Sequence, residues 1–283
     1  MTVSEIKKLY FDSLDGIYPE NELKAIFQLV VEDLWNLSRT DVLLNVKVDF
    51  EAKKQDFQDV LTRLKKYEPI QYILGKASFY GRSFFVNKHT LIPRQETEEL
   101  IQLIGKLNLP EQTRMLDIGT GSGIIPIICA LEFRFSHIEA IDISSDALIV
   151  AIKNAKKQVV DIRFSQLNVL SDMFVDKLQG PYNLIISNPP YVTESEQKLM
   201  KKNVLDYEPH LALFVSDDQP LIFYEKIVQI SKQQLASRGV LVVEINENYG
   251  EETKSLFEDN DLQEVTIVKD IHGKDRFVYG IKH

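Results

Sequence analysis

The segment Met115-Leu116-Asp117-Ile118-Gly119-Thr120-Gly121-Ser122-Gly123 joins an apolar, strand-like run to a helical stretch through three alternate glycines. Glycine permits positive φ and close approach of a ligand to the backbone, and the start of a helix offers unpaired N–H groups with a partial positive charge. An anionic or carboxylate-bearing ligand is therefore expected at this loop. The spacing G-x-G-x-G differs from the G-x-G-x-x-G of dinucleotide folds, and the loop lacks the Lys-Ser/Thr of a phosphate-binding P-loop.

An acidic residue, Asp142, ends the next strand-like run. It follows the loop by about 20 residues, where a carboxylate can accept hydrogen bonds from both hydroxyls of a ribose. The loop and Asp142 together indicate an adenosine-containing ligand, and the loop spacing favours S-adenosylmethionine over NAD. The alternative is an ordinary β-α turn in which Asp142 caps the helix that starts near Ser144.

Three more side chains could contact such a ligand. Asp117 is suited to orient the glycine loop or to receive the ammonium group of a methionine moiety through water, and hydrogen-bonding of the loop amides fits its place equally well. For the adenine end, Asn168 could bind the amino group and Met173 could pack on the ring. The segment that holds them, residues 167–173, also reads as an ordinary loop.

Short apolar runs alternate with helical patterns from about residue 94 onward. Strand-like runs lie at 113–118, 138–143, 162–167, 184–187 and 240–245, and helical patterns lie between most of them, for example at 144–157 and 219–237. This alternation predicts a parallel sheet with helices on both faces, the doubly wound α/β class of Rossmann-like folds. Two final strands, at 264–268 and 277–281, are too close for a helical crossover and should pair antiparallel.

The first 75 residues have a helical pattern instead. Apolar side chains recur at three- and four-residue steps after Pro19 and again after Asp49, which can cap a helix. The β-branched and aromatic run between Ala77 and Asn87 predicts a hairpin. We therefore expect a helical domain at 1–75, a hairpin linker at 76–90 and an α/β domain at 91–283.

Composition restricts the class of protein further. The chain has 283 residues, 44% hydrophobic and 27% charged, which is enough for a large core. The longest apolar run, 124–131, is shorter than the ~18 residues of a membrane span, and no secretory signal is visible, so we expect a soluble, cytoplasmic protein without membrane contact. Cys129 is the single cysteine, which suits a reducing setting, and we expect it in the core. No Cys/His spacing resembles a metal site.

The formal charge of −9 argues against direct contact with nucleic acid. The chain carries 33 Lys and Arg against 42 Asp and Glu, and residues 1–75 carry 10 against 13, so the helical region is not a basic arm. Such a balance repels a phosphate backbone unless basic residues cluster locally.

The strongest signal is Ser187-Asn188-Pro189-Pro190-Tyr191, which directly follows a strand-like run. Two consecutive prolines cannot continue a central strand, so they fix a rigid extended turn at the carboxyl edge of the sheet, where doubly wound proteins bind ligands. The Asn188 side-chain carbonyl and the Pro189 backbone carbonyl can accept both hydrogens of a planar NH2 group. The aromatic ring of Tyr191 can pack against the plane of the acceptor group or against the positively charged sulfonium. An exposed turn, or a proline-rich ligand for another domain, is the alternative.

These residues resemble the class I S-adenosylmethionine-dependent methyltransferases with an N-P-P-Y signature. Across nearly the whole chain the sequence is similar to the PrmC/HemK family of release factor glutamine methyltransferases. The segments that carry this likeness, besides the two motifs, are Glu68–Gly75, Leu91–Glu98, Tyr207-Glu208-Pro209 with Ala212-Leu213, and Asp270–Arg276. N-P-P-Y alone is shared with adenine and guanine amino methyltransferases, whereas Leu91–Glu98 and Glu68–Gly75 are far more specific.

The resemblance implies a helical bundle for substrate recognition, a β-hairpin linker and a seven-stranded methyltransferase domain. It implies methylation of the glutamine in the Gly-Gly-Gln loop of peptide chain release factors, which modulates translation termination. Carried over by position, the loop from Gly119 through Thr120, Gly121 and Ser122 to Gly123 binds S-adenosylmethionine with Asp142, and Asn188 binds both cofactor and glutamine. Pro189, Pro190 and Tyr191 shape the glutamine slot.

Three positions depart from the family pattern. Gln95 stands where many relatives have Pro, and Val215-Ser216 replaces a Gly pair; both could alter peptide fit. Asn168 stands where an acidic residue is common, so Asp172 and Met173 are rival adenine contacts. Arg94 could contact the acceptor protein, or form a salt bridge with a nearby carboxylate.

The mechanism expected from these residues is positioning without a general base. Asn188 and Pro189 would hold a poorly nucleophilic amide nitrogen in line with the methyl group, and the proton could leave after transfer. We expect a monomer. The rival functions are methylation of a ribosomal-protein glutamine, methylation of adenine in nucleic acid, which should require a basic recognition domain, and a non-catalytic adaptor with the same fold.

Overall fold

The computed structural model describes residues 1–133, 135–171 and 175–283. The chain forms two compact units. The smaller comprises Met1–Gly75 with Lys201–Tyr207, and the larger comprises Lys76–Met200 with Glu208–His283. Among the residues described, no helix is both long enough and apolar enough to cross a membrane.

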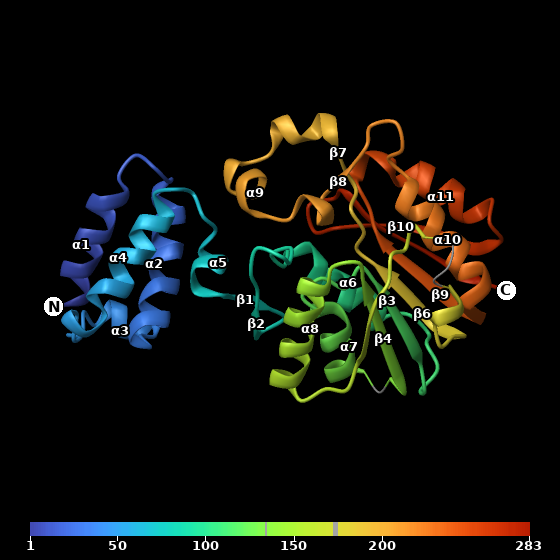
Figure 1. The fold of residues 1–283 in the computed structure, drawn as a ribbon, viewed down its shortest axis with the longest axis horizontal. Coiled ribbons are helices and arrows are strands. Elements are labelled where there is room, and N and C mark those ends of the chain that lie inside the picture. Colours follow the sequence, from blue (N-terminus) through green and yellow to red (C-terminus); the bar gives the residue numbers. More distant parts are fainter. Residues whose placement is uncertain (134, 172–174) are drawn as a thin grey trace. The chain divides into compact units, whose positions relative to one another are not determined.

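The larger unit is built on a mixed sheet, whose described residues form seven strands in the order β10-β11-β9-β6-β3-β4-β5 (Figure 1). The strands are β3 (Arg114–Ile118), β4 (His137–Asp142), β5 (Arg163–Gln166), β6 (Tyr182–Ser187), β9 (Leu235–Glu244), β10 (Leu262–Lys269) and β11 (Asp275–Lys282). Neighbours from β9 to β5 pair in parallel, and β11 is antiparallel to both β9 and β10. The chain leaves β3 towards β4 on one side and later places β6 on the other. Ligands bind outside the carboxyl ends of strands at such a switch point.

Helices cover both faces of this sheet because successive strand residues point to opposite sides. Met115 and Leu184 face the helices α6 (Glu96–Ile104), α7 (Ile124–Glu132) and α8 (Ser145–Gln158). Leu116 and Ile185, the next residues along, face α10 (Ile222–Gln234) and α11 (Gly250–Glu258). Figure 1 shows α6–α8 on one side of the strands and α10–α11 on the other.

Short elements complete the larger unit. The hairpin of β1 (Lys76–Phe79) and β2 (Arg82–Phe85) buries Phe79 and Phe84 with α6 and α7. Parallel pairing of β7 (Val192–Thr193) with β8 (Phe214–Val215) brings two chain segments together beside the N-P-P-Y motif. The 3-10 turns are η2 (Val175–Lys177), η3 (Glu194–Leu199), η4 (His210–Ala212) and η5 (Glu247–Tyr249).

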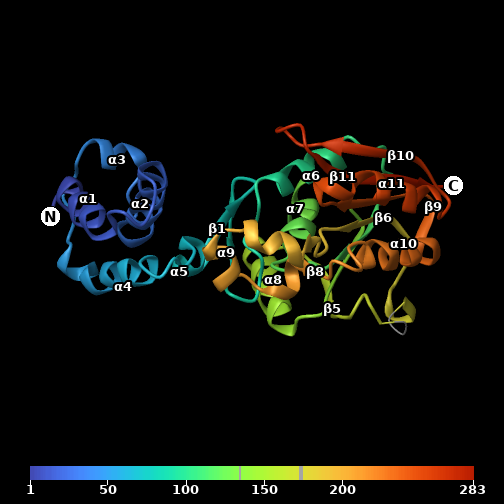
Figure 2. The same cartoon turned by 90° about the horizontal axis from the view of Figure 1, so that it is seen from above.

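The smaller unit is a helical bundle with its own core. Its elements are α1 (Val3–Leu14), α2 (Glu20–Trp35), α3 (Arg39–Leu43), η1 (Glu51–Lys53), α4 (Lys54–Leu64), α5 (Ile70–Leu74) and α9 (Lys202–Tyr207). Figure 2 shows α1, α2 and α4 packed side by side, and Tyr10, Val30 and Phe57 are buried between them. Full burial of such side chains stabilises by about 1.5 to 3 kcal/mol each. The Tyr207 hydroxyl of α9 donates to the Lys66 carbonyl oxygen at 2.8 Å.

The predicted fold class, antiparallel final strands, hairpin and N-terminal helices are confirmed. Some element boundaries differ from the predicted ones because hydrogen-bond pairing between strands sets where a strand begins. The strand predicted at 240–245 begins at Leu235, which pairs with Tyr182, so the preceding helix ends at Gln234 instead of 237. The Asp49 carboxylate accepts from the Ala52 N–H at 3.2 Å in the 3-10 turn η1, whereas the predicted helix α4 begins at Lys54, five residues after Asp49.

One glycine of the predicted cofactor loop has a packing role that can be tested by substitution to alanine. Gly123 and Gly273 both have positive φ, +77 and +79, so a Cβ costs about 1 to 2 kcal/mol at either. At Gly123 the new Cβ would meet the Ala151 Cβ at 3.0 Å, whereas at Gly273 no described atom lies within 4 Å. We expect Gly123→Ala to lower the free energy of unfolding by about 1 to 3 kcal/mol more than Gly273→Ala, measured by chemical denaturation. Equal losses would contradict this packing role.

Candidate active site

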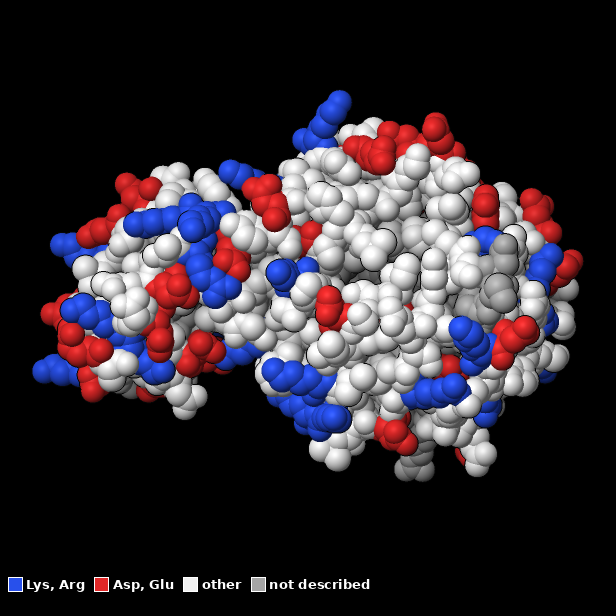
Figure 3. Space-filling view, in the orientation of Figure 1, with Lys and Arg blue, Asp and Glu red and all other residues white. Residues whose placement is uncertain are grey.

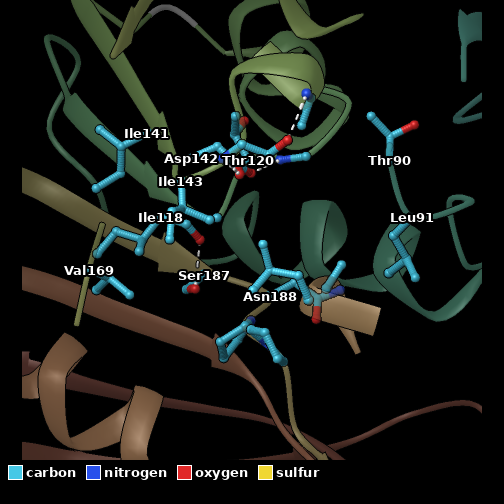
Figure 4. Close-up of a pocket in the computed structure, with 18 of the residues that line it drawn as sticks. Thr90, Leu91, Ile118, Thr120, Ile141, Asp142, Ile143, Val169, Ser187 and Asn188 are labelled. Carbon is cyan, nitrogen blue, oxygen red and sulfur yellow. Dashed lines mark hydrogen bonds between the residues drawn. The ribbon is translucent and has the colours of Figure 1, made fainter. Parts of the chain in front are cut away.

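A pocket of about 380 Å³ lies at the carboxyl edge of the sheet, at the switch point between β3 and β6. Its lining comes from the segments after β3, β4, β5 and β6, from residues 89–94 and from residues 209–212. In Figure 4, Asp142 and Thr120 lie above the cavity, Ile118 and Val169 beside it, and Asn188 below. A volume of this size suits a small organic ligand.

The glycine loop closes one end of this pocket. Gly119, Thr120, Gly121 and Ser122 line it, whereas Gly123 is the N-cap residue of α7 and packs against α8. The Gly119 and Thr120 N–H groups both donate to the Ile141 carbonyl oxygen, at 2.9 and 3.0 Å. The loop is therefore tied to β4, and Cβ positions at Gly119 and Gly121 would have no described atom within 4 Å. That open space lets a ligand approach the backbone closely.

Asp142 is positioned by the same loop. Its Oδ2 accepts from the Gly121 N–H at 2.8 Å and its Oδ1 accepts from the Ser144 N–H at 2.9 Å. Ser144, and not Asp142, caps α8, since the Ser144 Oγ accepts from the Ala147 N–H at 3.1 Å. Burial raises the pKa of Asp142, and the backbone hydrogen bonds oppose this rise. Each carboxylate oxygen can accept a second hydrogen bond, so both remain suited to ribose hydroxyls.

Asp117 lies fully buried behind the loop and does not line the pocket. Burial raises its pKa to about 7, and the Thr120 hydroxyl opposes the rise. Neither Asp117 carboxylate oxygen nor the Thr120 Oγ1 has a hydrogen-bond partner of normal geometry among the described residues. Unsatisfied buried polar groups are rare in folded proteins, so these three oxygens require a partner such as a water molecule or a ligand.

The predicted adenine contacts divide into described and undescribed residues. Asn168 lines the pocket, and its Oδ1 accepts from the Leu170 N–H at 2.9 Å. The Asn168 Oδ1 keeps a second lone pair that can accept from an adenine amino group, and its Nδ2 can donate to a ring nitrogen, so the adenine contact stays a prediction. Met173 and its rival Asp172 lie outside the described residues.

Asn188 joins a buried polar cluster at the other end of the pocket. Its Nδ2 donates to the Glu244 Oε2 at 2.9 Å and lies 3.5 Å from the Thr97 Oγ1. Thr97 also donates to the Glu244 Oε2, at 3.0 Å. Asn188, Pro189 and Pro190 line the pocket, whereas Glu244 is 1% exposed and lies outside the lining.

Tyr191 is tied to the same buried carboxylate as Asn188. It is not among the described lining residues of the pocket, and its hydroxyl donates to the Glu244 Oε1 at 3.0 Å. Burial and the neighbouring Glu244 carboxylate raise its pKa. The Asn246 Nδ2 holds the Tyr191 carbonyl oxygen at 3.1 Å. The hydrogen bond to the buried Glu244 carboxylate fixes the phenol of Tyr191 beside the motif. Contact of its ring with an acceptor stays a prediction.

Arg94 lines the pocket and forms an ion pair with Glu208. Its Nη2 lies 2.7 Å from the Glu208 Oε1, and the other carboxylate oxygen accepts from the Ile92 N–H at 3.1 Å. Of the two roles left open for Arg94, the structure contains the salt bridge. The Arg94 side chain keeps 34% of its surface exposed, so contact with an acceptor protein stays a prediction.

Charge is sparse around the pocket. Among its described lining residues, Arg94, Asp142 and His89 are the ones with ionisable side chains, and the His89 Nδ1 lies 3.6 Å from the Asp146 Oδ2. Figure 3 shows one face of the larger unit, largely uncharged at its centre with Lys and Arg towards the periphery. In the described part of the chain, no group of three or more His, Cys, Asp or Glu side chains could hold a metal ion.

Comparisons with known proteins assign the family. The chain is 41% identical to the release factor glutamine methyltransferase of Flavobacterium psychrophilum, over 98% of both chains. It is 43% identical to that of Bacteroides thetaiotaomicron, over 94% of this chain and 95% of the relative. The chain belongs to the release factor glutamine methyltransferase family. Residues 11–75 match the PrmC N-terminal domain and residues 97–210 match the methyltransferase small domain.

Solved structures support the fold of this glutamine methyltransferase family member. The METTL16 methyltransferase domain has a TM-score of 0.54 at 16% identity and covers 83% of this chain and 99% of its own. A methyltransferase from Pyrococcus furiosus has a TM-score of 0.52 at 13% identity, covering 82% and 98%. At these identities the likeness concerns the fold alone, and it confirms the predicted class I methyltransferase architecture.

Two residues of the methyltransferase site were not predicted as functional. Thr97 enters the sequence analysis only within the segment Leu91–Glu98 that carries the family likeness, and Glu244 follows the last valine of the strand-like run 240–245 without a role assigned to it. The signal was available for Glu244, because it is the one charged residue in the otherwise apolar run Val240–Ile245. A carboxylate in a strand that is buried on both faces needs hydrogen-bond partners. The polar side chains that supply them are therefore candidates for the functional site.

The raised pKa of Asp117 predicts how stability depends on pH. Between the unfolded value of about 3.9 and the folded value of about 7, the folded protein holds a proton that the unfolded chain has released. Stability therefore falls as the pH rises through this window. We expect Asp117→Asn to remove up to about 3 kcal/mol of the stability difference between pH 5 and pH 8, measured by urea unfolding without ligand. The same pH dependence in both proteins would contradict a protonated, buried Asp117.

Proposed function

We propose that this enzyme transfers a methyl group from S-adenosylmethionine to the side-chain amide nitrogen of the glutamine in the Gly-Gly-Gln motif of peptide chain release factors. The relatives that share about 40% identity over nearly the full chain are named release factor glutamine methyltransferases. The observation that carries the proposal is the orientation of Asn188. Its Nδ2 is committed to Glu244, and no described residue donates to its Oδ1 or to the Pro189 carbonyl oxygen.

The residues of the pocket fit S-adenosylmethionine. The open backbone at Gly119 and Gly121 would take the methionine moiety. The Thr120 Oγ1 in the pocket lining would accept from its ammonium group, and Asp117, buried behind the loop, would reach that group through water. Asp142 would hold the ribose, and the apolar Ile143 and Val169 would enclose the adenine. S-adenosylmethionine supplies, when bound, an electrophilic methyl group on a sulfonium.

The acceptor end of the pocket then acts by positioning. A glutamine side-chain nitrogen is a weak nucleophile because its lone pair is delocalised into the carbonyl. Acceptance of its two hydrogens by the Asn188 Oδ1 and the Pro189 carbonyl raises electron density on nitrogen and aims its lone pair out of the amide plane. The nitrogen becomes strongly acidic once methylated, so its proton can leave to water and no matched base is required.

Features of the chain favour a protein acceptor over nucleic acid. The pocket lining has one cation, Arg94, and that one is paired, among the residues described. The helical bundle at residues 11–75 matches the N-terminal domain of the family, and we assign it recognition of the release factor. The enzyme would act as a monomer on this partner.

The decisive test is transfer of a labelled methyl group. The purified protein, S-adenosylmethionine with a labelled methyl and a release factor are incubated, and the label is mapped by mass spectrometry. We expect label on the Gly-Gly-Gln glutamine alone, and none on a release factor with Gly-Gly-Ala. Label on a ribosomal protein or on adenine instead would overturn the proposed acceptor.

Asn188→Ala tests the acceptor site within the same assay. We expect a loss of at least 100-fold in kcat with the fold intact, because one of the two acceptors for the amide hydrogens is removed. Asn260→Ala, between α11 and β10 and outside the described pocket lining, is the matched control and should leave kcat unchanged. Near wild-type turnover of the Asn188 variant would contradict the proposed mechanism.

Asp142→Asn tests the cofactor end. The amide can replace only one of the two carboxylate acceptors, so we expect affinity for S-adenosylmethionine to fall by about 1 to 3 kcal/mol, or roughly 5- to 150-fold, in calorimetric titration. Asp146→Asn, with a 58% exposed side chain at the start of α8, is the control. Unchanged affinity would remove Asp142 from the ribose site.

A further inference from the structure

Glu244 is a carboxylate buried at the end of β9 with three polar side chains around it. The Asn188 Nδ2 and the Thr97 hydroxyl both donate to its Oε2, at 2.9 and 3.0 Å, and the Tyr191 hydroxyl donates to its Oε1 at 3.0 Å. Glu244 is 1% exposed, so water does not compete for these positions. The three hydrogen bonds use both carboxylate oxygens.

This arrangement fixes which end of the Asn188 amide faces the pocket. A carboxylate oxygen accepts hydrogen bonds and cannot pair with the Asn188 Oδ1. Rotation of the amide by 180° would bring two oxygens together in a buried place and leave an N–H pair without its partner, which is costly. The Nδ2 therefore stays on Glu244, and the Oδ1 stays free for the pocket.

Neighbouring groups oppose the effect of burial on the charge of Glu244, although its pKa stays raised. Burial raises the pKa of Glu244, while the hydrogen bonds from Thr97 and Tyr191 and the positive charge of Arg276 act in the opposite direction. Arg276 is itself held by Asp270, through its Nε and Nη2, each at 3.1 Å.

We propose that Glu244 is a positioning residue that holds Asn188 as a hydrogen-bond acceptor and thereby restricts the site to an amide nitrogen with two hydrogens. The inference rests on the proposed function and deepens it by assigning the source of its selectivity. With Asn188 fixed, the acceptor end presents two acceptors, the Asn188 Oδ1 and the Pro189 carbonyl. A primary amide satisfies both with its two N–H groups.

Two close analogues of glutamine cannot satisfy both the Asn188 Oδ1 and the Pro189 carbonyl oxygen. A glutamate carboxylate brings only acceptors, so oxygen would face oxygen at both contacts. A glutamine that already carries one methyl has a single N–H, which leaves one acceptor unpaired and sets the methyl group against it. Each mismatch should weaken binding by about 10- to 100-fold, the range for a buried acceptor left without its partner. The same geometry limits the product to one methyl group.

Glu244→Gln removes the restriction with little change of volume. A glutamine amide offers a donor and an acceptor, so it can pair with either end of the Asn188 amide. Asn188 would then populate both orientations, and the flipped one presents the Nδ2 donor, which suits a carboxylate.

The experiment compares binding of release factors with Gly-Gly-Gln and with Gly-Gly-Glu, in the presence of S-adenosylhomocysteine, by calorimetry. We expect the wild type to prefer glutamine by at least 10-fold and Glu244→Gln to lower that preference to below about 3-fold, with kcat for methylation reduced at least 10-fold. Glu247→Gln makes the same change three residues later, on an exposed side chain outside the cluster, and should keep both values. A Glu244→Gln protein with the wild-type preference overturns the inference.

A second measurement needs no substitution in the protein that is tested. In the wild type, the Asn188 Nδ2 protons, assigned in NMR spectra by their loss in Asn188→Asp, should exchange with water at least 10-fold more slowly than those of the exposed Asn21. Fast exchange overturns the inference even if Glu244→Gln does not fold. A wild type that methylates no release factor overturns the proposed function instead, and slow exchange would still support the Glu244 contact.

Discussion

The parallel pairing of β6 with β3 on one side and β9 on the other is the constraint on which the site depends. The register aligns Ser187 with Ile118 and with Val243. The residues that follow these three, Asn188, Gly119 and Glu244, must therefore emerge together at the carboxyl edge of the sheet. A hydrogen bond from the buried Ser187 hydroxyl to the Ile118 carbonyl oxygen, at 2.7 Å, adds a side-chain link across the same edge. Cofactor loop, acceptor turn and supporting carboxylate are thus set by one ladder.

Buried carboxylates are a poor way to stabilise a core, and this larger unit contains several at one edge. A well-packed apolar residue would serve the sheet at least as well as Glu244, because desolvation of a charge offsets most of what its partners contribute. The partners of Glu244 come from two separate segments: Thr97 lies in α6, and Asn188 and Tyr191 lie in the N-P-P-Y motif. Glu244 links the N-P-P-Y motif to the start of α6. The orientation of these side chains therefore accounts for a buried carboxylate better than a gain in stability does. The cluster is also where the pKa values of buried groups depart from their ordinary range, a common property of functional sites.

The two ends of the pocket differ in how far their polar groups are already satisfied. Asp142 is held by two backbone N–H groups, which fixes its carboxylate before any ligand binds. Asp117 and Thr120, in contrast, keep buried oxygens without partners of normal geometry among the described residues. These oxygens lost their hydrogen bonds to water when the chain folded, and a ligand could supply new ones. This favours a role in binding over a merely structural role. At the proposed acceptor end, the Asn188 Oδ1 and the Pro189 carbonyl oxygen have no donor among the described residues, because the Asn188 Nδ2 already donates to Glu244.

The sequence by itself determined the order of elements, the position of the cofactor loop and the acceptor turn, because alternating burial, glycine at positive φ and consecutive prolines are local properties of a chain. It also placed Asp142 and Asn188 at strand ends, where a parallel sheet gathers them. Only the tertiary structure decided the partners: that Tyr191 turns to Glu244, that Arg94 pairs with Glu208, and that Thr97 meets Glu244 across 147 positions of chain. These contacts depend on strand register and on packing between distant segments, and no periodicity along the chain encodes which side chains that packing brings within hydrogen-bond distance.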